Sequence, residues 1–322
     1  EIRDRLPGAG LPWLKNLRSG AIERFADCGL PNSRVEEWKY TNLSRILDPQ
    51  PVLAGPSVNG VHRASLKQYY LDPTPCHRMV FVNSYYRPDL SETGVLPAGL
   101  TLCSLETALA ERPELLEAHW GSLHDLSEDR LSGKNDLKPH AMIALNTAFA
   151  AGGAVIHLDH NVSLDGPIHL IYLTALEGER PAMSHPRTLV VAEAGAHATI
   201  FETFIGDGGD AHCCNALTQV SVGPGARVCH YKHQGEAPNG THIGSSHICL
   251  EKNSTYNGFV LSDGALVSRN EIRVQLEGEN VDCSLDGIYL ARGNQHMDNW
   301  IRVDHMAPLG KTREVYKGVI DG

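Results

Sequence analysis

The sequence predicts a mainly β protein, in which a parallel β-helix core follows an N-terminal helical α+β region. The first observation is that apolar residues alternate along strand-length segments between residues 189 and 305. The clearest copy is 274–285, where apolar residues share one face both before and after a central turn. The second observation is that similar turns recur with a spacing that falls from 30 to 26 residues, at Gly195, Gly225, Asn253 and Glu279.

A repeat of this length is typical of a solenoid, in which each coil leaves an apolar face that only the next coil can cover. An antiparallel sandwich or barrel also has short strands at regular spacing and is the alternative fold. Equivalent residues of successive coils stack in a solenoid. We therefore expect aligned interior positions for Val222, Leu250, Leu276 and Val303.

The first 140 residues show a different pattern. Residues 1–47 have apolar residues at helical spacing with a stop at Gly29, and residues 102–117 predict one or two short helices. A strand is expected at 79–83, whereas 48–75 is rich in Pro, Gly and Ser and predicts a loop or linker. Strand patterns dominate from Ala141 onward, so the predicted domains are 1–140 and 141–322.

The composition is that of an ordinary globular protein, with 42% hydrophobic and 20% charged residues among 322. No apolar run is long enough to span a membrane, and no secretion leader opens the chain. The net charge of −10 argues against a nucleic-acid partner, because a protein that binds nucleic acid usually carries a basic stripe on its surface. We expect a cytoplasmic protein. The chain begins without Met and ends after a strand-like segment, so we also expect part of the natural protein to be missing.

The eight cysteines form no CxxC pair and no disulfide framework, which favours free thiols in a reducing cytosol. Cys213 and Cys214 are neighbours, so on a strand their thiols point to opposite faces and joint ligation of one ion is awkward. Cys283 shares a face with Val281 and Leu285. We expect it to be a buried core residue rather than a nucleophile.

Seventeen histidines raise the question of a metal site. The segment 225–236 resembles a cupin site, which would make the protein a metal-binding barrel. That site needs two histidines on one face of a strand. His230 and His233 are three residues apart, and so are His157 and His160. Each pair should therefore point to opposite faces, which argues against a metal site in this segment.

Other catalytic patterns do not fit. Gly310-Lys311-Thr312 ends like a phosphate-binding loop, but His305 stands where the first Gly is required. No hydrolase triad, dinucleotide fingerprint or paired-carboxylate motif stands out, so no catalytic residue is assigned. A β-helical carbohydrate-active enzyme is the alternative function. Such enzymes line a groove with aromatic residues, and this chain has only 6%.

Two separated segments carry a family resemblance. Residues 295–308 with 312–319, and the R-x-E-x-W-K-Y-T segment at 34–41, resemble the SufB/SufD family of iron-sulfur cluster assembly proteins. On composition alone, 34–41 is expected to be a solvated turn with aromatic anchors. Residues 79–91 and the repeats from 141 onward are also similar, so the resemblance covers almost the whole chain. The N-terminal region lacks the longer extension of SufB, which favours the SufD branch.

The resemblance implies a right-handed parallel β-helix and a non-catalytic scaffold subunit. It implies partners similar to SufB and to the ATPase SufC, and a homodimer when the protein is alone. SufC binds a C-terminal helical segment of the family, which we expect to be absent from this sequence. No cofactor is expected to bind stably, although a transient iron-sulfur cluster could be shared with the partner subunit. The family's proposed cluster histidine lies beyond Lys317-Gly318, outside this chain. Trp300 and the turn 309–311 depart from the family pattern.

Strand alternation divides the segment 296–305 into two faces. We expect Met297, Ile301, Val303 and His305 to face inward, with His305 as a hydrogen-bonded core histidine. His296 faces outward with Asp298, Arg302 and Asp304, and it is the candidate for contact with a partner or a cluster. The last strands, around 302–320, should pair with a second subunit or with a missing C-terminal segment, because a solenoid end needs a cap.

Overall fold

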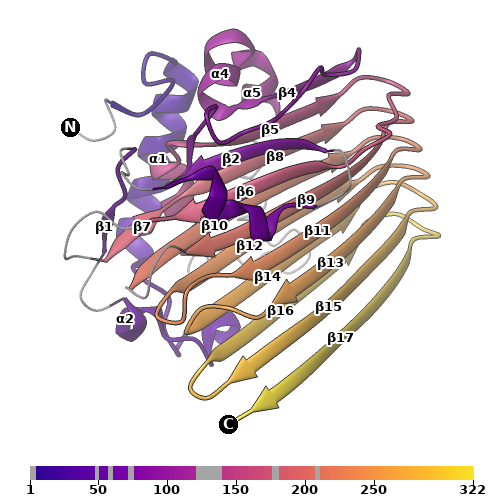
Figure 1. Cartoon of the computed structure of the whole chain (residues 1–322). Helices are drawn as coiled ribbons and strands as arrows, with labels where there is room; N and C mark the ends of the chain where they lie inside the picture. The colour runs from indigo at the N-terminus through magenta and orange to yellow at the C-terminus, as the bar shows by residue number, and fades with distance from the viewer. Residues whose placement is uncertain are drawn as a thin grey trace.

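The computed structural model describes residues 5–47, 51–56, 61–71, 76–120, 140–175, 181–206 and 211–322. Two sheets face each other across a shared interior (Figure 1). The first sheet contains β16 (His296–His305), β14 (Val267–Leu276), β12 (Thr241–Leu250), β10 (His212–Val222), β8 (Pro186–Ala192), β5 (Gly152–Leu158) and β4 (Leu100–Ser104), with β7 (Ala182–Ser184) and β1 (Val52–Leu53) at its side. The second contains β17 (Lys311–Asp321), β15 (Asp282–Arg292), β13 (Thr255–Ser262), β11 (Arg227–Gly235), β9 (His197–Gly206), β6 (Ile168–Thr174), β2 (His77–Val82) and β3 (Tyr85–Tyr86).

The pairings confirm the parallel β-helix. From β8 to β17 successive strands alternate between the sheets, and each pairs in parallel with the strand two positions further along the chain. The antiparallel alternative is therefore wrong for this region. The antiparallel pairs among the described strands lie in the N-terminal part, between β2 and β3 and between β4 and β5.

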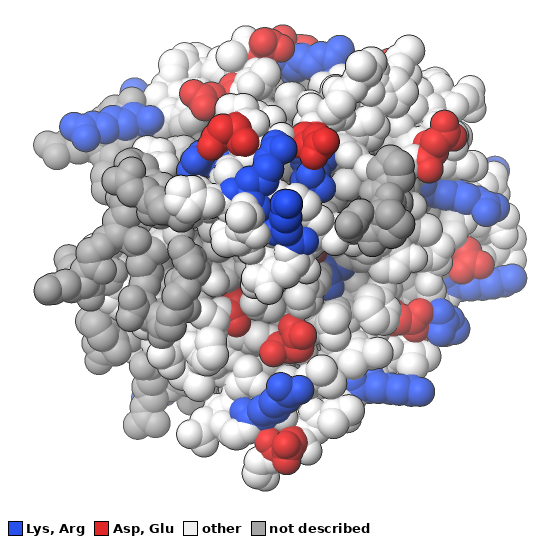
Figure 2. Space-filling view, viewed as in Figure 1, with Lys and Arg blue, Asp and Glu red and all other residues white. Residues whose placement is uncertain are grey.

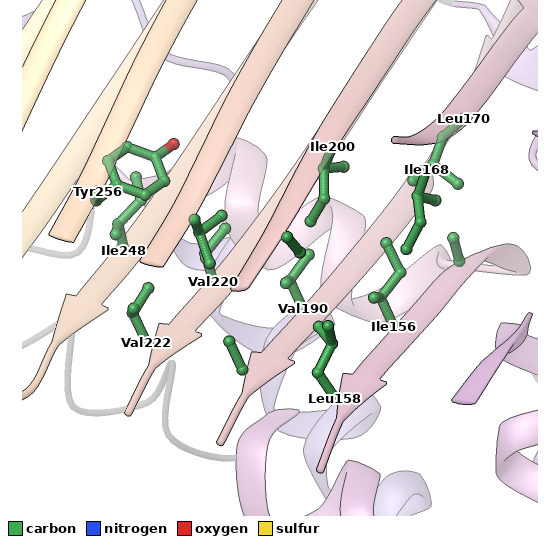
Figure 3. Packing of buried hydrophobic residues seen from close by; sticks show 14 of the residues in the cluster. Ile156, Leu158, Ile168, Leu170, Val190, Ile200, Val220, Val222, Ile248 and Tyr256 are labelled. Carbon is green, nitrogen blue, oxygen red and sulfur yellow. The ribbon is translucent and has the colours of Figure 1, made fainter. Parts of the chain in front are cut away.

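Apolar side chains form continuous rows inside the solenoid (Figure 3). One row runs through Ile156, Val190, Val220, Ile248, Val274 and Val303. A neighbouring row aligns Val222, Leu250 and Leu276, as predicted, but its next member is His305. The expected place of Val303 in that row is wrong by two residues, because the coil from Leu276 to His305 is longer than the coil before it.

The turns that follow the strands of the first sheet also stack. Their backbone has positive φ, between 58° and 72°, at Asn161, Gly195, Gly225, Asn253, Asn280 and Leu309. In each of the first five, the N–H donates to a carbonyl oxygen of the next turn, at 2.9–3.4 Å. Three predicted turn positions are confirmed, and the fourth lies at Asn280 instead of Glu279. Glycine and asparagine suit this conformation, whereas Leu309 is strained in it.

Helices of the N-terminal part cover the outer face of the first sheet (Figure 1). They are α1 (Pro12–Cys28), α2 (Leu43–Ile46), α4 (Leu105–Glu111), α5 (Pro113–Trp120) and α6 (Ala141–Phe149), with a 3-10 turn at Glu36–Trp38. The short helix α3 (Arg63–Leu66) and the 3-10 turn Lys67–Tyr69 lie instead on the second sheet, where Leu66 packs with Val80 and Ile171. Leu14 and Leu116 pack with Val155 and Leu189, which point outward from the sheet. One or two short helices were expected at 102–117, and the segment contains two, α4 and α5, after the end of β4 at Ser104.

Other N-terminal expectations changed. The helical segment expected at 1–47 contains one long helix, α1, which ends at Cys28 before a 3-10 turn and the short α2. The expected loop at 48–75 contains β1 and α3, and 48–50, 57–60 and 72–75 lie outside the described residues. The strand expected at 79–83 is β2, which joins the second sheet. The domain division at residue 140 stays a prediction.

The structure also bears on membrane and nucleic-acid contacts. No helix in the described ranges is both long and apolar enough to cross a membrane. On the face shown in Figure 2, the coloured basic and acidic side chains are interspersed, and neither sign forms a continuous stripe there.

Candidate functional site

Polar side chains interrupt the apolar interior in the middle coils. In the second sheet one inward row reads Leu170, Glu202, Lys232 and Val260, so two charged residues lie between two apolar ones. Glu202 is fully buried, and Lys232 is only 4% exposed. Burial of a charged group is costly unless partners compensate it. The contacts of these residues therefore mark this part of the interior as the candidate site.

Glu202 is the centre of a hydrogen-bonded network. Its carboxylate accepts from the hydroxyl of Thr188 at 2.6 Å and from that of Thr218 at 2.9 Å. Both threonines come from the opposite sheet, so the carboxylate links the two sheets. His230 Nε2 donates at 2.9 Å to Oε2, the same oxygen that accepts from Thr218, and His230 Nδ1 lies 2.9 Å from the Tyr256 hydroxyl.

Electrostatics keeps Glu202 ionised. Burial alone would raise the pKa of this carboxyl group, but the hydrogen bond and charge of His230 lower it, assisted by Thr188 and Lys232. The net result is a pKa below the ordinary value. Burial lowers the pKa of Lys232, and the charges of Glu202 and Glu236 oppose that effect. The network is thus an internal anion held between neighbouring cationic and hydroxyl groups.

A second polar group lies nearby, where β11 turns into β12. Glu236 follows β11, and its Oε1 atom lies 2.5 Å from His242 Nδ1. Gln234 donates to Glu236 Oε2 at 2.6 Å. Cys214 is the neighbour of His242 on the adjacent strand β10. One ligand-type atom of each of Cys214, Glu236 and His242 lies within 4.8 Å of the others, and all three residues are buried.

The chemistry available here is that of an acid-base and ligand site. Burial would raise the pKa of Glu236, but the charge and hydrogen bond of His242 outweigh it and lower the pKa to about 2. Burial raises the pKa of the Cys214 thiol well above its usual range, so the free thiol is protonated and a weak nucleophile. Thiol, imidazole and carboxylate together are donors that suit a transition metal.

A small cavity extends from the network toward the later coils. It is lined by His230, Lys232, Tyr256 and Tyr316, among others. The space open to the centre of a water molecule is about 10 Å³, which is room for about one water. The polar interior is therefore closely packed.

Sequence reasoning missed both groups. The prediction that Cys213 and Cys214 point to opposite faces is confirmed, because Cys213 packs with the helices and Cys214 faces the interior. Opposite faces exclude joint ligation of one ion by the two cysteines. They do not exclude a site that Cys214 forms with interior residues of other strands. The available signal was parity: His230 and Lys232 have the same strand parity as the interior residue Val228. Charged residues at positions that strand alternation places inside the solenoid indicate a polar interior.

The other histidine predictions have mixed outcomes. His230 is interior and His233 lies on the outer side near Asp263, so that pair does point to opposite faces. For His157 and His160 the face argument is wrong, because β5 ends at Leu158. Both imidazoles lie within 3.7 Å of the Glu193 carboxylate.

The end of the chain also differs from expectation. His305 is exposed, although it continues an interior row, because β16 is the edge strand of its sheet. It lies 3.0 Å from the Thr312 hydroxyl. The expectation of a buried core histidine is therefore wrong. Cys283, by contrast, is 1% exposed and packs in the interior, as predicted.

The segment 34–41 and His296 meet in space. Trp38 is buried, and the guanidinium of Arg269 lies 4.0 Å from the centre of its ring. Thr41 donates to Asp298 at 2.5 Å, and its hydroxyl oxygen lies 3.0 Å from His296 Nε2. The expectation of a solvated turn is only partly right, because Tyr40 is exposed but Trp38 and Thr41 fasten the segment to β14 and β16. A role of His296 toward a partner or cluster stays a prediction.

Comparison with known proteins decides the family. Residues 2–170 match a family described as SufBD protein N-terminal region, and residues 173–322 match the family SUF system FeS cluster assembly, SufBD core domain. The chain belongs to the SufBD family. The second match begins near the end of β6, so the SufBD core domain contains the coils from β8 onward and both polar groups.

Individual relatives agree. The chain is 29% identical over 319 residues to an iron-sulfur cluster assembly SufBD family protein of Synechocystis, and the match covers 96% of this chain and 66% of that protein. It is 23% identical to the iron-sulfur cluster assembly protein SufD of Escherichia coli, over 93% of this chain and 64% of the relative. SufD of Bacillus subtilis is 22% identical, over 94% and 67%. The chain therefore spans about two thirds of the length of these relatives.

Proposed function

We propose that this chain is a scaffold subunit of an iron-sulfur cluster assembly complex of the SUF system. In this proposal it pairs with a SufB-like subunit and a SufC-like ATPase in the cytoplasm, and the cluster is cargo that is passed on to other proteins. Membership of the SufBD family and similarity to two proteins named SufD support it. Membership of this family accounts for the β-helix, so the alternative of a carbohydrate-active enzyme is not needed to explain the fold.

The observation that carries the partner proposal is the C-terminal end of the solenoid. β16 and β17 are the edge strands of the two sheets, and β17 lies along the lower edge in Figure 1. Three of its apolar side chains are exposed, Val315, Val319 at 60% and Ile320 at 75%. Edge strands with unpaired backbone groups and exposed apolar residues are suited to strand pairing with another chain. The proposed occupant is a SufB-like subunit, a second copy when the protein is alone, or a segment from the third of the relatives' length that this chain does not span.

Co-expression with SufB-like and SufC-like subunits tests the proposal. We expect the three chains to co-purify. After anaerobic supply of iron and sulfide, the complex should gain the visible absorbance of sulfide-bridged iron. Failure of the chains to associate, or the same absorbance without this subunit, would contradict the scaffold role.

A pair of variants tests the surface. Val319→Glu places a charge on the exposed edge strand, and we expect it to weaken association because strand pairing would bury that carboxylate. Val95→Glu is the matched control, since Val95 is 94% exposed and precedes β4, far along the chain from the edge strand. Sedimentation of the isolated wild-type protein is compared with that of each variant. This comparison also shows whether the same edge strand forms the homodimer. Equal association of both variants would remove β17 from the interface.

A further inference from the structure

We propose that a pocket between the N-terminal helices and the first sheet binds a small, uncharged, mainly apolar molecule that carries a hydrogen-bond acceptor. The pocket has a volume of about 630 Å³, which lies within the range of about 300–1,000 Å³ that is usual for small-molecule sites. Apolar side chains from α1, β1, α6 and β7 line it, among them Phe25, Leu53, Leu145, Phe149 and Met183. Its size and apolar walls are those of a ligand pocket.

His185 is the buried polar side chain of this pocket, and its tautomer follows from its partners. Its Nδ1 atom lies 3.1 Å from Nδ2 of Asn215, which also donates to the Met142 carbonyl oxygen at 2.9 Å. Because a carbonyl oxygen only accepts, the Asn215 atom between these two groups is the amide nitrogen, and His185 Nδ1 accepts from it. Burial lowers the pKa of His185 to about 3, so the ring is neutral and carries its proton on Nε2.

The Nε2–H group is the second observation, independent of the shape of the pocket. His185 is 4% exposed, and Nε2 has no hydrogen-bond partner among the described residues. The surrounding atoms do not enclose Nε2 completely, so the N–H group has access to the pocket that the ring lines. The Phe149 ring stacks on the imidazole, with 6.0 Å between the ring centres, and helps to fix its orientation. An unpaired donor in apolar surroundings favours a ligand that brings an acceptor.

The lining also selects an uncharged ligand. None of the described residues that line the pocket has a charged side chain, and the other polar one, Ser44, is exposed. An anionic group would lose its water here without gaining a cationic partner, which is costly. The oxygen of a ketone, an ester or an alcohol can accept from Nε2–H without that cost.

The competing interpretation is that the pocket is only a packing gap between the helices and the sheet, with its N–H group hydrated. That interpretation predicts no saturable binding of a small molecule. It also predicts that removal of the N–H group leaves the relative affinity for molecules with and without an acceptor unchanged.

Equilibrium dialysis of the whole chain tests binding with 2-acetylnaphthalene, which carries one ketone oxygen on an apolar body. We expect saturable binding of about one molecule per chain. Ala26→Trp narrows the pocket from an exposed position on α1 and should weaken binding at least about 10-fold. Asn16→Trp is the matched control, because Asn16 is exposed on the same helix and does not line the pocket. No saturable binding, or equal affinity of the wild-type protein and Ala26→Trp, would overturn the proposal.

A second probe tests the hydrogen bond. 2-Isopropylnaphthalene has a similar shape but no acceptor, and His185→Phe keeps an aromatic ring but removes Nε2–H. The preference for the ketone over the hydrocarbon should fall about 5- to 10-fold in this variant, because one hydrogen bond is lost. The ratio of the two affinities within each protein cancels their different costs of transfer from water. An unchanged ratio would overturn the role of His185.

Two measurements on the wild-type protein avoid any folding defect of His185→Phe. The NMR signal of the His185 Nε2 proton should shift when the ketone binds and shift much less with the hydrocarbon. 2-Naphthoate, which has a carboxylate in place of the ketone, should bind more weakly than the ketone. An unmoved proton signal, or tighter binding of the anion, would overturn the assignment. None of these readouts involves a partner subunit, so their failure leaves the proposed function untouched.

Discussion

Replacement of Glu202 by Gln tests whether the interior network holds the two sheets together. The change keeps the size of the side chain but removes its charge and turns one acceptor oxygen into a donor. Three donors now converge on the carboxylate, from Thr188, Thr218 and His230. The Oε1 atom lies within hydrogen-bond distance of both threonine hydroxyl groups, so Gln can accept from both with its remaining oxygen, and the main loss is the charged contact with His230.

The size of the effect follows from this single contact. Loss of one partner of a buried ion pair costs about 3–5 kcal/mol, and we expect the lower end, about 3 kcal/mol, because the hydroxyl contacts survive. An unfolding entropy of about 2.1 cal/mol/K per residue converts that loss into a melting temperature lower by about 4 °C for a chain of this length. Urea unfolding at neutral pH measures the free energy directly.

Glu251→Gln is the matched control, because Glu251 is exposed at a turn of the solenoid. Its stability should change by less than about 0.5 kcal/mol. The pH dependence adds a second check. The pKa of Glu202 is lower in the folded protein than in the unfolded chain. Its contribution to folding stability is therefore fully present above the ordinary carboxyl pKa and is lost as the pH falls through the lowered folded pKa. The difference between wild type and Glu202→Gln should therefore shrink in acid. Equal stability of the wild-type protein and Glu202→Gln at neutral pH would refute the reasoning.

Three further predictions concern packing, backbone and thiols. Trp38→Ala should destabilise the protein by about 3–5 kcal/mol and speed proteolysis within 34–41, because it removes a buried ring that packs on Arg269, whereas Tyr40→Ala should change little. Leu309→Asn should raise stability in urea by up to about 1 kcal/mol by relieving the positive φ of 63°, and no gain would show that the last turn frays before the solenoid unfolds. Cys283 should stay unlabelled by a thiol reagent in the native protein, because burial raises its pKa to about 12. The partly exposed Cys229 should react. Equal labelling rates of the two thiols would show that the interior opens.

Local features of the sequence were enough to predict the coils. Alternation of apolar residues is set by the geometry of a single strand, so the interior faces of residues such as Val220 and Ile248 follow from parity. Gly195, Gly225 and Asn253 mark turns because few other residues adopt positive φ readily. The resemblance carried by 34–41 and 295–319 extended this local pattern to a family. Parity also contained the signal of a polar interior, in His230 and Lys232.

Tertiary structure decided which distant residues meet. The row that contains Leu276 continues with His305 rather than Val303, because the length of the intervening coil sets the register and no local pattern reports it. Cys214 and His242 become neighbours only when two coils stack, and Glu236 joins them through the turn between strands. His296 reaches Thr41, 255 residues away, because the N-terminal segment folds back on the outer face of the sheet. Contacts between coils depend on the register of the whole solenoid, and that register exists only in the folded chain.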